Sequence, residues 1–487
     1  MTKNVIISVY DKTDLDIVSK FLIKKKFTIY STGGTSDFLR KNNIPHIEIS
    51  KYTKQKEILD GRVKTLHPKI FGGLLGTTSQ KHQKELRSEK IVNFDMLIIN
   101  LYPFEATIKK TKKFDEIIEM IDIGGHSLIR AAIKNYAKTT PVVSPADYKE
   151  IIRKLPRSLA EKKKYVIKAL QHITDYDIAI NNWFQGTTTE EYPLRYGENP
   201  QQKAVALINN KSFVQLGGEK KLSYNNLLDL DAAINIAYNS NSKENICTII
   251  KHNIPCGGAI KKRQQDSYLK ALAGDPVSAF GGIIAFNQKL TLDTAKHITK
   301  NFYEVVAAPN FEKEALKMLQ TKKNLRILKV KKFKNHTEQR SIFAGALIQD
   351  SNNKSSQIKS IYGKNQLKKD QLSFFVNILK YIKSNAIALF DKESLISQSG
   401  GQTSRIDALQ NCFYKLKLKH DYKKFKNLYL FSDAFFPFTD SLKLIKKENM
   451  QVDIYAPMGS QNDQKIEAFV KKNKLNFFRL SDRHFKH

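Results

Sequence analysis

The chain has 487 residues and a formal net charge of +35, and 41% of its residues are hydrophobic. This composition is typical of a globular protein and excludes a largely disordered chain. No apolar run approaches the ~18 residues that a membrane-spanning helix needs, which excludes an integral membrane protein. The first residues also lack a basic segment followed by an apolar one, so we expect no secretory signal.

The cysteines and the charge bear on location and partners. Cys247, Cys256 and Cys412 are odd in number and form no C-x-x-C pair, so neither a disulfide framework nor a cysteine-rich zinc site is expected. We therefore expect a cytoplasmic protein without a bound metal. Only 13 of the 82 basic residues are arginine, and the lysines are spread over nearly every polar segment. This spread favours solvated surfaces over a nucleic-acid groove, although a nucleic-acid-binding protein with one contiguous basic face remains an alternative.

In chain order, the first 143 residues alternate apolar strand-like runs with amphipathic helical patterns, as in a parallel α/β sheet. The continuous apolar run 96–101 is typical of a central strand buried on both faces. The predicted strands are 5–9, 28–30, 46–49, 96–101 and 140–143, and the predicted helices are 15–22, 35–41, 114–120 and 127–137.

A helical, lysine-rich stretch follows, most clearly over residues 165–183, and we place a domain boundary near residue 190. Mixed α/β patterns then return. They contain apolar runs at 246–250, 282–286 and 305–308, a lysine-rich stretch at 329–334 and a helix around 374–382. The sequence thus predicts an α/β protein with three parts, which could include two similar halves at the end: 1–190, 191–365 and 366–487.

Several motifs in the first part have residue types suited to binding a phosphate. Ser31–Thr35 lies between a strand and a helix, so its backbone N–H groups can face an anion, although an ordinary glycine-rich turn fits equally well. The stretch 61–69 combines lysines, an arginine and a histidine, and its alternative is a solvated basic loop. Tyr102 follows the buried strand, Asp122 lies in a Gly-rich turn, and Lys134 lies on the next helix; packing and helix capping are their alternatives.

The later parts contain a second set. Lys251 and His252 follow a strand, and a neighbouring ammonium favours a neutral imidazole, which can act as a base. The stretches 274–282 and 432–440 place aromatic and carboxylate groups around Gly or Pro turns that can clasp a flat ring, although packing explains several of the phenylalanines. A zinc-deaminase signature is absent, because Ala259 stands where a second cysteine is required.

Taken in order, these motifs resemble the bifunctional purine-biosynthesis family that combines phosphoribosylaminoimidazolecarboxamide formyltransferase with inosine monophosphate (IMP) cyclohydrolase. The resemblance covers essentially the whole chain. The matching segments are 8–12, 31–35, 61–68, 100–104, 122–125, 195–200, 222–226, 251–257, 275–282, 383–386, 401–405, 432–440 and 483–485.

The resemblance implies a methylglyoxal-synthase-like domain for the cyclohydrolase, followed by two cytidine-deaminase-like subdomains for formyl transfer, without zinc. It implies 10-formyltetrahydrofolate as co-substrate. It also implies a homodimer with shared formyltransferase sites, small-molecule nucleotide and folate substrates, and no nucleic-acid or membrane partner. The chemistry expected is formyl transfer to the amine of aminoimidazole carboxamide ribonucleotide, followed by ring closure to IMP with loss of water.

The resemblance also assigns roles to residues. The implied catalytic residues are Lys251, His252 and Asn385 for formyl transfer, and Lys64, Tyr102, Asp122 and Lys134 for cyclisation. The implied folate-binding residues are Asn385, Phe435, Pro437, Asp440, Arg405 and Phe280. The implied nucleotide-binding residues are Ser8, Lys12, Ser31, Thr32, Gly33, Gly34, Thr35, Arg62, Thr65, Asn100, Arg195, Tyr196, Asn226, Gly281 and Arg483.

Four positions depart from the family pattern. Gln201 stands where histidine is common, which puts the rate of formyl transfer in doubt. Tyr10, Phe71 and His126 replace the residues usual at their positions, and they flank the expected cyclohydrolase site. A relic that keeps one activity, or a deaminase-like module without catalysis, is therefore a further alternative.

Overall fold

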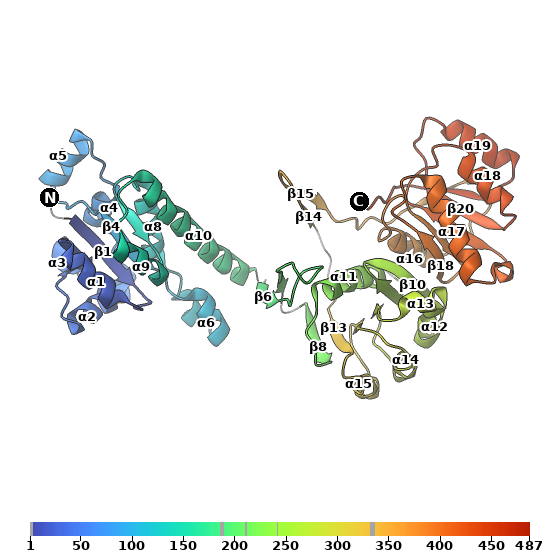
Figure 1. Cartoon of the computed structure of the whole chain (residues 1–487), viewed down its shortest axis with the longest axis horizontal. Helices are drawn as coiled ribbons and strands as arrows, with labels where there is room; N and C mark the ends of the chain where they lie inside the picture. The colour runs from blue at the N-terminus through green and yellow to red at the C-terminus, as the bar shows by residue number, and fades with distance from the viewer. Residues whose placement is uncertain (1–2, 186–188, 210–211, 241, 332–336) are drawn as a thin grey trace. The chain divides into compact units, whose positions relative to one another are not determined.

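The computed structural model describes residues 3–185, 189–209, 212–240, 242–331 and 337–487. The chain divides into two units, Met1–Thr188 and Thr189–His487, which Figure 1 shows in blue to dark green and in green to red. This division lies two residues before the boundary predicted near residue 190. No helix of the described residues is long and apolar enough to cross a bilayer.

Unit 1 is built on one five-stranded parallel sheet with the order β3-β2-β1-β4-β5. The predicted parallel α/β sheet is therefore confirmed. Its strands are β1 (Lys3–Val9), β2 (Phe27–Ser31), β3 (Ile47–Glu48), β4 (Met96–Asn100) and β5 (Thr140–Val142). Its helices are α1 (Leu15–Lys24), α2 (Gly33–Lys41), α3 (Ile49–Thr53), α4 (Pro68–Leu75), α5 (Gln80–Ser88), α6 (Phe104–Lys110), α7 (Phe114–Ile118), α8 (Ile123–Lys134), α9 (Tyr148–Arg153) and α10 (Leu159–Phe184).

Helices cover both faces of this sheet because its central strands are apolar on both sides. In β1, Val5 and Ile7 pack in one cluster with Leu15 of α1, while Ile6 between them packs in another with Leu128 of α8. Successive strand residues point to opposite faces, so an unbroken apolar run needs a layer of helices on each side. Since all the strands are parallel, their carboxyl ends meet at one edge of the sheet.

The third predicted strand is shorter than expected. Only Ile47 and Glu48 pair with β2, and Ile49 already begins α3. Ile49 is buried and packs with Tyr30 in the cluster on the α8 side of the sheet. The side chain therefore serves the core from a helix, which an apolar pattern of four residues cannot distinguish from a strand.

Unit 2 contains two six-stranded mixed sheets with the orders β10-β9-β11-β12-β13-β8 and β16-β21-β20-β19-β17-β18. Read from β10 and from β18, both sheets show the same series: antiparallel, antiparallel, parallel, parallel, antiparallel. Their strands are β8 (Phe213–Gly217), β9 (Asn245–Lys251), β10 (Ile254–Lys261), β11 (Ile283–Phe286), β12 (Val305–Ala308), β13 (Arg326–Val330), β16 (Ile358–Tyr362), β17 (Ile387–Phe390), β18 (Leu395–Ser399), β19 (Leu428–Ser432), β20 (Val452–Pro457) and β21 (Phe477–Leu480). The two halves considered from sequence therefore have one topology, and β16 starts the second sheet before residue 366.

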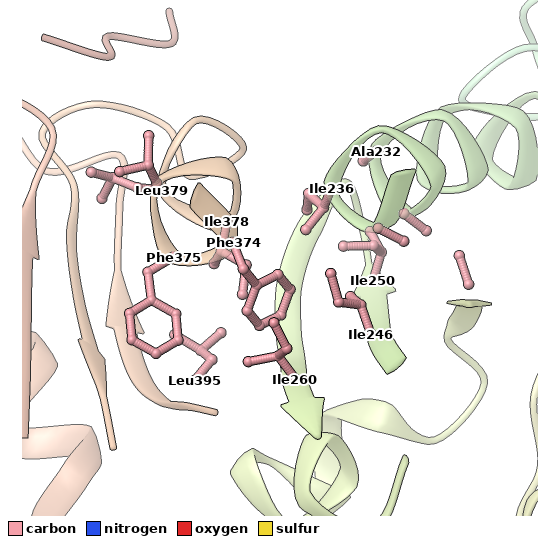
Figure 2. Packing of buried hydrophobic residues seen from close by; sticks show 14 of the residues in the cluster. Ala232, Ile236, Ile246, Ile250, Ile260, Phe374, Phe375, Ile378, Leu379 and Leu395 are labelled. Carbon is pink, nitrogen blue, oxygen red and sulfur yellow. The ribbon is translucent and has the colours of Figure 1, made fainter. Parts of the chain in front are cut away.

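The two halves of unit 2 share one hydrophobic core. Phe374 and Ile378 of one half lie among Ile246, Ile250 and Ile260 of the other, as Figure 2 shows.

The helices of unit 2 are α11 (Tyr224–Tyr238), α12 (Gln264–Gly274), α13 (Pro276–Ala279), α14 (Leu292–Ile298), α15 (Lys313–Gln320), α16 (Lys369–Leu379), α17 (Arg405–Lys419), α18 (Asp440–Lys447) and α19 (Asp463–Lys472). Two hairpins complete the unit: β6 (Thr189–Pro193) with β7 (Val205–Asn209), and β14 (Thr337–Ile342) with β15 (Gly345–Asp350).

Candidate active sites

A cavity of about 660 Å³ opens in unit 1 at the carboxyl ends of β1, β2 and β4. This is the edge where open α/β sheets hold their ligands. The cavity brings together residues that are far apart in the sequence. The predicted site residues on its wall are Ser8, Lys12, Thr32, Gly34, Thr35, Arg62, Lys64, Thr65, Asn100, Tyr102 and Asp122.

One end of the cavity is formed by the start of α2. Thr32 occupies the N-cap position of this helix, and its hydroxyl lies 3.3 Å from the hydroxyl of Ser8. The backbone N–H of Val9 donates to the Thr35 hydroxyl at 3.0 Å, which fixes the first turn of α2 against β1. The backbone N–H groups at a helix start favour an anion. This end of the cavity is therefore suited to a phosphate group.

Cationic side chains reach the same end. Lys64 Nζ lies 3.6 Å from the point that a Cβ atom on Gly33 would occupy, and Gly33 has φ +45°, a conformation that favours glycine. A larger residue there would be strained and would crowd the ammonium group. Arg62 forms an ion pair with Glu119, which also lines the cavity. This pair engages Nε and Nη2 of the guanidinium, whose remaining N–H groups are donors for an anion.

Asp122 is a half-buried carboxyl group on the cavity wall. It caps the start of α8, where its carboxylate accepts the Gly125 N–H at 2.6 Å. Burial raises the pKa of Asp122 above its ordinary value, while the N–H of Gly125 and the Lys64 ammonium oppose this rise. A carboxylate whose pKa is raised is a stronger base than an ordinary carboxylate, so it can accept a proton and later return it.

Tyr176 of α10 fixes the backbone that leads to Asp122, and the sequence patterns did not identify it. Its hydroxyl accepts the Asp122 N–H at 2.8 Å and donates to the Met120 carbonyl. Tyr176 is buried. The hydrogen bond to Asp122 joins residues 54 positions apart in the sequence, so no local sequence pattern predicts it.

Several predicted residues do not reach this wall. Lys134 is exposed at the last position of α8, about 18 Å along the helix axis from the capping Asp122 at 1.5 Å per residue. Ser31 is buried and donates to the Ile7 carbonyl at 2.8 Å, and it borders a smaller cavity of about 170 Å³ together with Gly33. These positions do not place Ser31 and Lys134 in contact with a ligand in the main cavity.

Positions near the cavity that depart from the family pattern have structural contacts. Tyr10 lies on the wall with its ring edge-on to Tyr102 at 6.1 Å. Phe71 packs on the core between α4 and α8, and His126 approaches Asp177 of α10 at 3.2 Å. Asn100 accepts the N–H groups of residues 10 and 11 at 2.7 and 2.9 Å. It therefore shapes this part of the wall through the backbone.

In unit 2, Lys251 and His252 lie where β9 ends, and neither is buried. The Lys251 ammonium donates to the carbonyl of Phe280 and lies 3.1 Å from the point that a Cβ on Gly281 would occupy. The turn at His252 has φ +54°, and its backbone N–H donates to the Asp229 carboxylate at 3.1 Å. Asp229 therefore orients this turn, and the sequence patterns missed it.

Of the predicted nucleotide contacts of this half, Asn226 lies at the start of α11, and Arg195 and Tyr196 contact each other. The Arg195 guanidinium lies 5.2 Å from the ring centroid of Tyr196. Asn226 is buried, and its amide accepts from the Ser223 N–H and donates to Glu304 at 2.6 Å. The amide of Asn226 is thus already engaged. Its contribution in this structure is to hold the start of α11.

A second group of predicted residues surrounds the start of β17 and the C-terminal segment. The side-chain amide of Asn385 donates to the carbonyls of Gln402 and Thr403 at 3.0 and 3.2 Å. The Arg483 guanidinium lies 5.0 Å from the ring centroid of Phe485. The folate-binding candidates Phe435, Pro437 and Asp440 follow β19, and of these three Asp440 is exposed.

Arg405 does not have the exposed position expected of a folate ligand. It is 7% exposed and forms an ion pair with the fully buried carboxylate of Asp433, and it also donates to the hydroxyl of Ser432. A buried charge needs such a partner. In this structure Arg405 therefore holds the loop after β19, and its contact with folate stays a prediction.

The two groups of unit 2 belong to different halves, and no hydrogen bond or ion pair that we find among the described residues joins one group to the other. Each group therefore contains only some of the residues predicted for the formyltransferase site. Nor do three His, Cys, Asp or Glu side chains of the described residues gather as a set of metal ligands.

Comparison with known proteins identifies the family. Residues 132–415 match the family described as "AICARFT/IMPCHase bienzyme", and residues 15–127 match the "MGS-like domain". The chain belongs to the AICARFT/IMPCHase bienzyme family. The MGS-like match falls in unit 1, which contains the parallel sheet, as the family resemblance implied.

Full-length relatives agree with this membership. Proteins named "Bifunctional purine biosynthesis protein PurH" are 39% identical in Prochlorococcus marinus (strain MIT 9515), 38% in Fusobacterium nucleatum and 37% in Persephonella marina, each over 100% of both chains. Among solved structures, "Crystal structure of ForH" has a TM-score of 0.35 and 22% identity and covers 38% of this chain and 97% of its own. This AICARFT/IMPCHase bienzyme is thus a bifunctional enzyme of purine biosynthesis, with formyltransferase and IMP cyclohydrolase activities.

Replacing Tyr176 by phenylalanine should slow the cyclohydrolase of this AICARFT/IMPCHase bienzyme without affecting formyl transfer. The change removes the hydroxyl that is hydrogen-bonded to the backbone of Asp122 and Met120. Each of these hydrogen bonds contributes about 1 kcal/mol to the stability of the segment. We expect kcat of cyclisation to fall about tenfold, because small displacements of a reacting group are costly. Tyr165→Phe is the matched control, since Tyr165 lies buried on the same helix but packs on the other side of the sheet. Equal losses in both variants would contradict the positioning role of Tyr176.

Replacing Ser384 by alanine should slow formyl transfer. Ser384 precedes Asn385, and its hydroxyl donates to Asp433 at 2.5 Å and accepts the Lys486 N–H at 3.1 Å. Losing both contacts frees the segment that carries Asn385, so we expect kcat to fall about 10- to 100-fold, with rescue by Ser384→Thr. Ser394→Ala removes a comparable hydroxyl-to-Asp391 bond elsewhere in the unit and should leave kcat unchanged. Unaltered kinetics in Ser384→Ala would show that Asn385 is positioned without this contact.

Proposed function

We propose that the cavity of unit 1 is the cyclohydrolase site and that the two groups of unit 2 form the formyltransferase site. The observation that supports the first assignment most is the meeting of Lys64, Tyr102 and Asp122 on one wall, beside the start of α2. That cavity is large enough for a nucleotide-sized ligand. It also combines an anion-binding end with a carboxyl group of raised pKa.

In the cyclisation, the carboxamide nitrogen attacks the formyl carbon, and the formyl oxygen finally leaves as water. The carboxamide nitrogen loses one proton as it attacks, and the nitrogen that carries the formyl group loses its proton as the C=N bond of the new ring forms. These two protons leave with the formyl oxygen as water. Asp122 accepts the first proton and can return it to the oxygen, because burial raises its pKa and makes its ionised form a stronger base. The Lys64 ammonium stabilises the negative charge that develops on the oxygen. Because the step is intramolecular, holding the phosphate at α2 supplies the required orientation.

In the formyl transfer, the ring amine attacks the formyl carbon of 10-formyltetrahydrofolate, and the bond from this carbon to N10 then breaks. His252 accepts the proton that the amine loses and can pass it to N10. The Lys251 ammonium stabilises the tetrahedral oxyanion. The Lys251 ammonium donates a hydrogen bond to the Phe280 carbonyl, and this bond holds the ammonium at the end of β9.

We further propose that the enzyme is a homodimer that works in the cytoplasm. The separation of the two groups in one chain supports a site completed by a second copy. The β14–β15 hairpin supports an interface, because its residues are all exposed and include Phe343, Leu347 and Ile348. The three cysteines are free thiols, as expected in a reducing compartment. Light scattering of the intact chain should give twice the monomer mass.

The deciding experiment supplies aminoimidazole carboxamide ribonucleotide with 10-formyltetrahydrofolate and follows tetrahydrofolate and IMP together. Both products should form in equal amounts. A second assay supplies the formylated intermediate alone, which should be cyclised without folate. Formation of neither product by the folded protein would refute the proposed assignment of both sites.

A further inference from the structure

The edge of the first sheet in unit 2 that carries Lys251 continues past the proposed site of formyl transfer. β9 runs antiparallel to β11, and β12 and β13 run parallel to β11. The end of β9 therefore lies at the same edge as the starts of the other three strands. Loops 280–282, 299–304 and 321–325 follow one another along it, at intervals of about 4.8 Å per strand.

A second cavity, of about 220 Å³, lies between the last two of these loops. It is separate from the residues assigned to catalysis. Its wall is made of apolar, hydroxyl, amide and ammonium groups: Ile298, Thr299, Asn301, Phe302, Tyr303, Thr321, Lys322, Lys323, Asn324 and Leu325.

An exposed aromatic pair lies between this cavity and the end of β9. Phe302 is part of the cavity wall, and its ring centroid lies 5.2 Å from that of Phe280, with 44° between the planes. The side chains are 43% and 62% exposed. The backbone ties the two loops together, since the Gly281 N–H donates to the Phe302 carbonyl at 2.8 Å. Together the rings offer a fixed apolar surface to a flat group.

The cavity lining also contains two cationic side chains. Lys322 and Lys323 are both exposed, and neither forms an ion pair with a carboxylate among the residues that the structure describes. Thr321 and Asn324 flank them with a hydroxyl and an amide. The Thr321 hydroxyl already donates to the Met318 carbonyl at 2.7 Å, whereas the two ammonium groups can take up carboxylate groups of a ligand without leaving a carboxylate partner.

We propose that this cavity binds the glutamyl tail of the folate co-substrate, while Phe280 and Phe302 contact its aminobenzoyl ring. The inference rests on the proposed function of unit 2. In a 10-formylated folate, the formyl-bearing nitrogen, the benzoyl ring and the glutamate carboxylates follow one another in a line. Along the sheet edge, Lys251 and His252, the aromatic pair and the two lysines follow in the same order, across about 14 Å for three strand intervals.

The test compares monoglutamyl with triglutamyl 10-formyltetrahydrofolate in the full-length enzyme. The wild type should have the lower KM for the triglutamyl form. In the double variant Lys322→Ala/Lys323→Ala, we expect KM for the triglutamyl form to rise about three- to tenfold, as for the loss of exposed ion pairs. kcat and the cyclohydrolase should stay unchanged. Calorimetric titration with unformylated pteroyl-triglutamate should show the same loss of affinity.

Lys313→Ala/Lys317→Ala is the charge-matched control, because both lysines are exposed on α15 and lie outside the cavity. It should retain the preference of the wild type for the triglutamyl form. An equal loss in both double variants, or none in either, overturns the proposed tail site. The two proposals fail differently: a wild type without formyl transfer refutes the function of unit 2, whereas an active wild type with an unaltered tail preference in Lys322→Ala/Lys323→Ala refutes only the tail site.

Discussion

Replacing His252 by alanine is expected to abolish formyl transfer while added formylated intermediate is still converted to IMP. The imidazole is the only titratable side chain proposed to take the proton of the attacking amine. Loss of a general base costs about 10²- to 10⁴-fold in rate. The measurement is kcat for tetrahydrofolate release, with the cyclisation rate of the same preparation as internal reference.

The backbone at His252 calls for a second variant. Its φ of +54° strains most residues but is tolerated well by asparagine. His252→Asn should therefore keep the turn and its bond to Asp229 while lacking the imidazole, and it should be as inactive in formyl transfer as His252→Ala. His297→Ala, which removes an imidazole bonded to Gln265 in the same half, should remain active. Normal formyl transfer in His252→Asn would exclude the imidazole as the base.

Replacing Lys64 by alanine is expected to make the formylated intermediate accumulate. The ammonium lies at the start of α2, beside Gly33, and acts on Asp122 through its charge. Without it, both the developing oxyanion and the ionised carboxylate lose stabilisation. We expect kcat of cyclisation to fall about 10²- to 10³-fold, comparable to removing an oxyanion donor. Folate turnover should continue at the wild-type rate, and chromatography of the reaction should show the intermediate.

The same variant has an expected pH dependence. Burial raises the pKa of Asp122, and the Lys64 ammonium lowers it in part. Removing the ammonium therefore raises this pKa further, so the ionised form that accepts a proton becomes populated only at higher pH. The acidic limb of kcat/KM for the residual cyclisation should shift to higher pH. Lys69→Ala, a half-buried lysine next to Tyr52 that does not line the cavity, should leave this limb in place.

These variants also test whether the two reactions are separate. Each substitution changes a residue in only one unit. If Lys64→Ala stopped formyl transfer as well, or His252→Asn stopped cyclisation, in a protein that remains folded, the assignment of one reaction to each unit would be wrong.

In unit 1, the sequence motifs identified which residues line the cavity better than they identified how those residues are arranged. Lys64, Tyr102 and Asp122 do share a cavity. Tyr102 follows β4, whose carboxyl end lies at the same edge as those of β1 and β2, whereas Lys64 and Asp122 come from the segments before α4 and α8. Tyr176 was missed, because its contact comes from a helix that is distant in sequence. Lys134 was expected with Asp122, but it occupies the other end of their common helix, and only the helix geometry reveals that separation.

In unit 2 the motifs were read as ligand contacts where the fold also uses them internally. Arg405 is buried against Asp433, and Asn226 is bonded to Glu304, although polar residues in such motifs are typical of binding sites. A sequence does not reveal whether a polar group faces a ligand or another buried group, because that depends on which elements pack together.

By itself, the sequence determined that the chain is an α/β protein and that its first sheet is parallel, whereas the roles of its motifs in two reactions came from their resemblance to a known family. Apolar periodicity and the placement of Gly-rich turns contain the information on the fold locally. Only the tertiary structure decided that Tyr176 holds Asp122, that Arg405 is internal, and that Phe302 and two lysines extend the edge beyond Phe280. These contacts join residues that are brought together by the order of strands and the packing of helices, which no local pattern specifies.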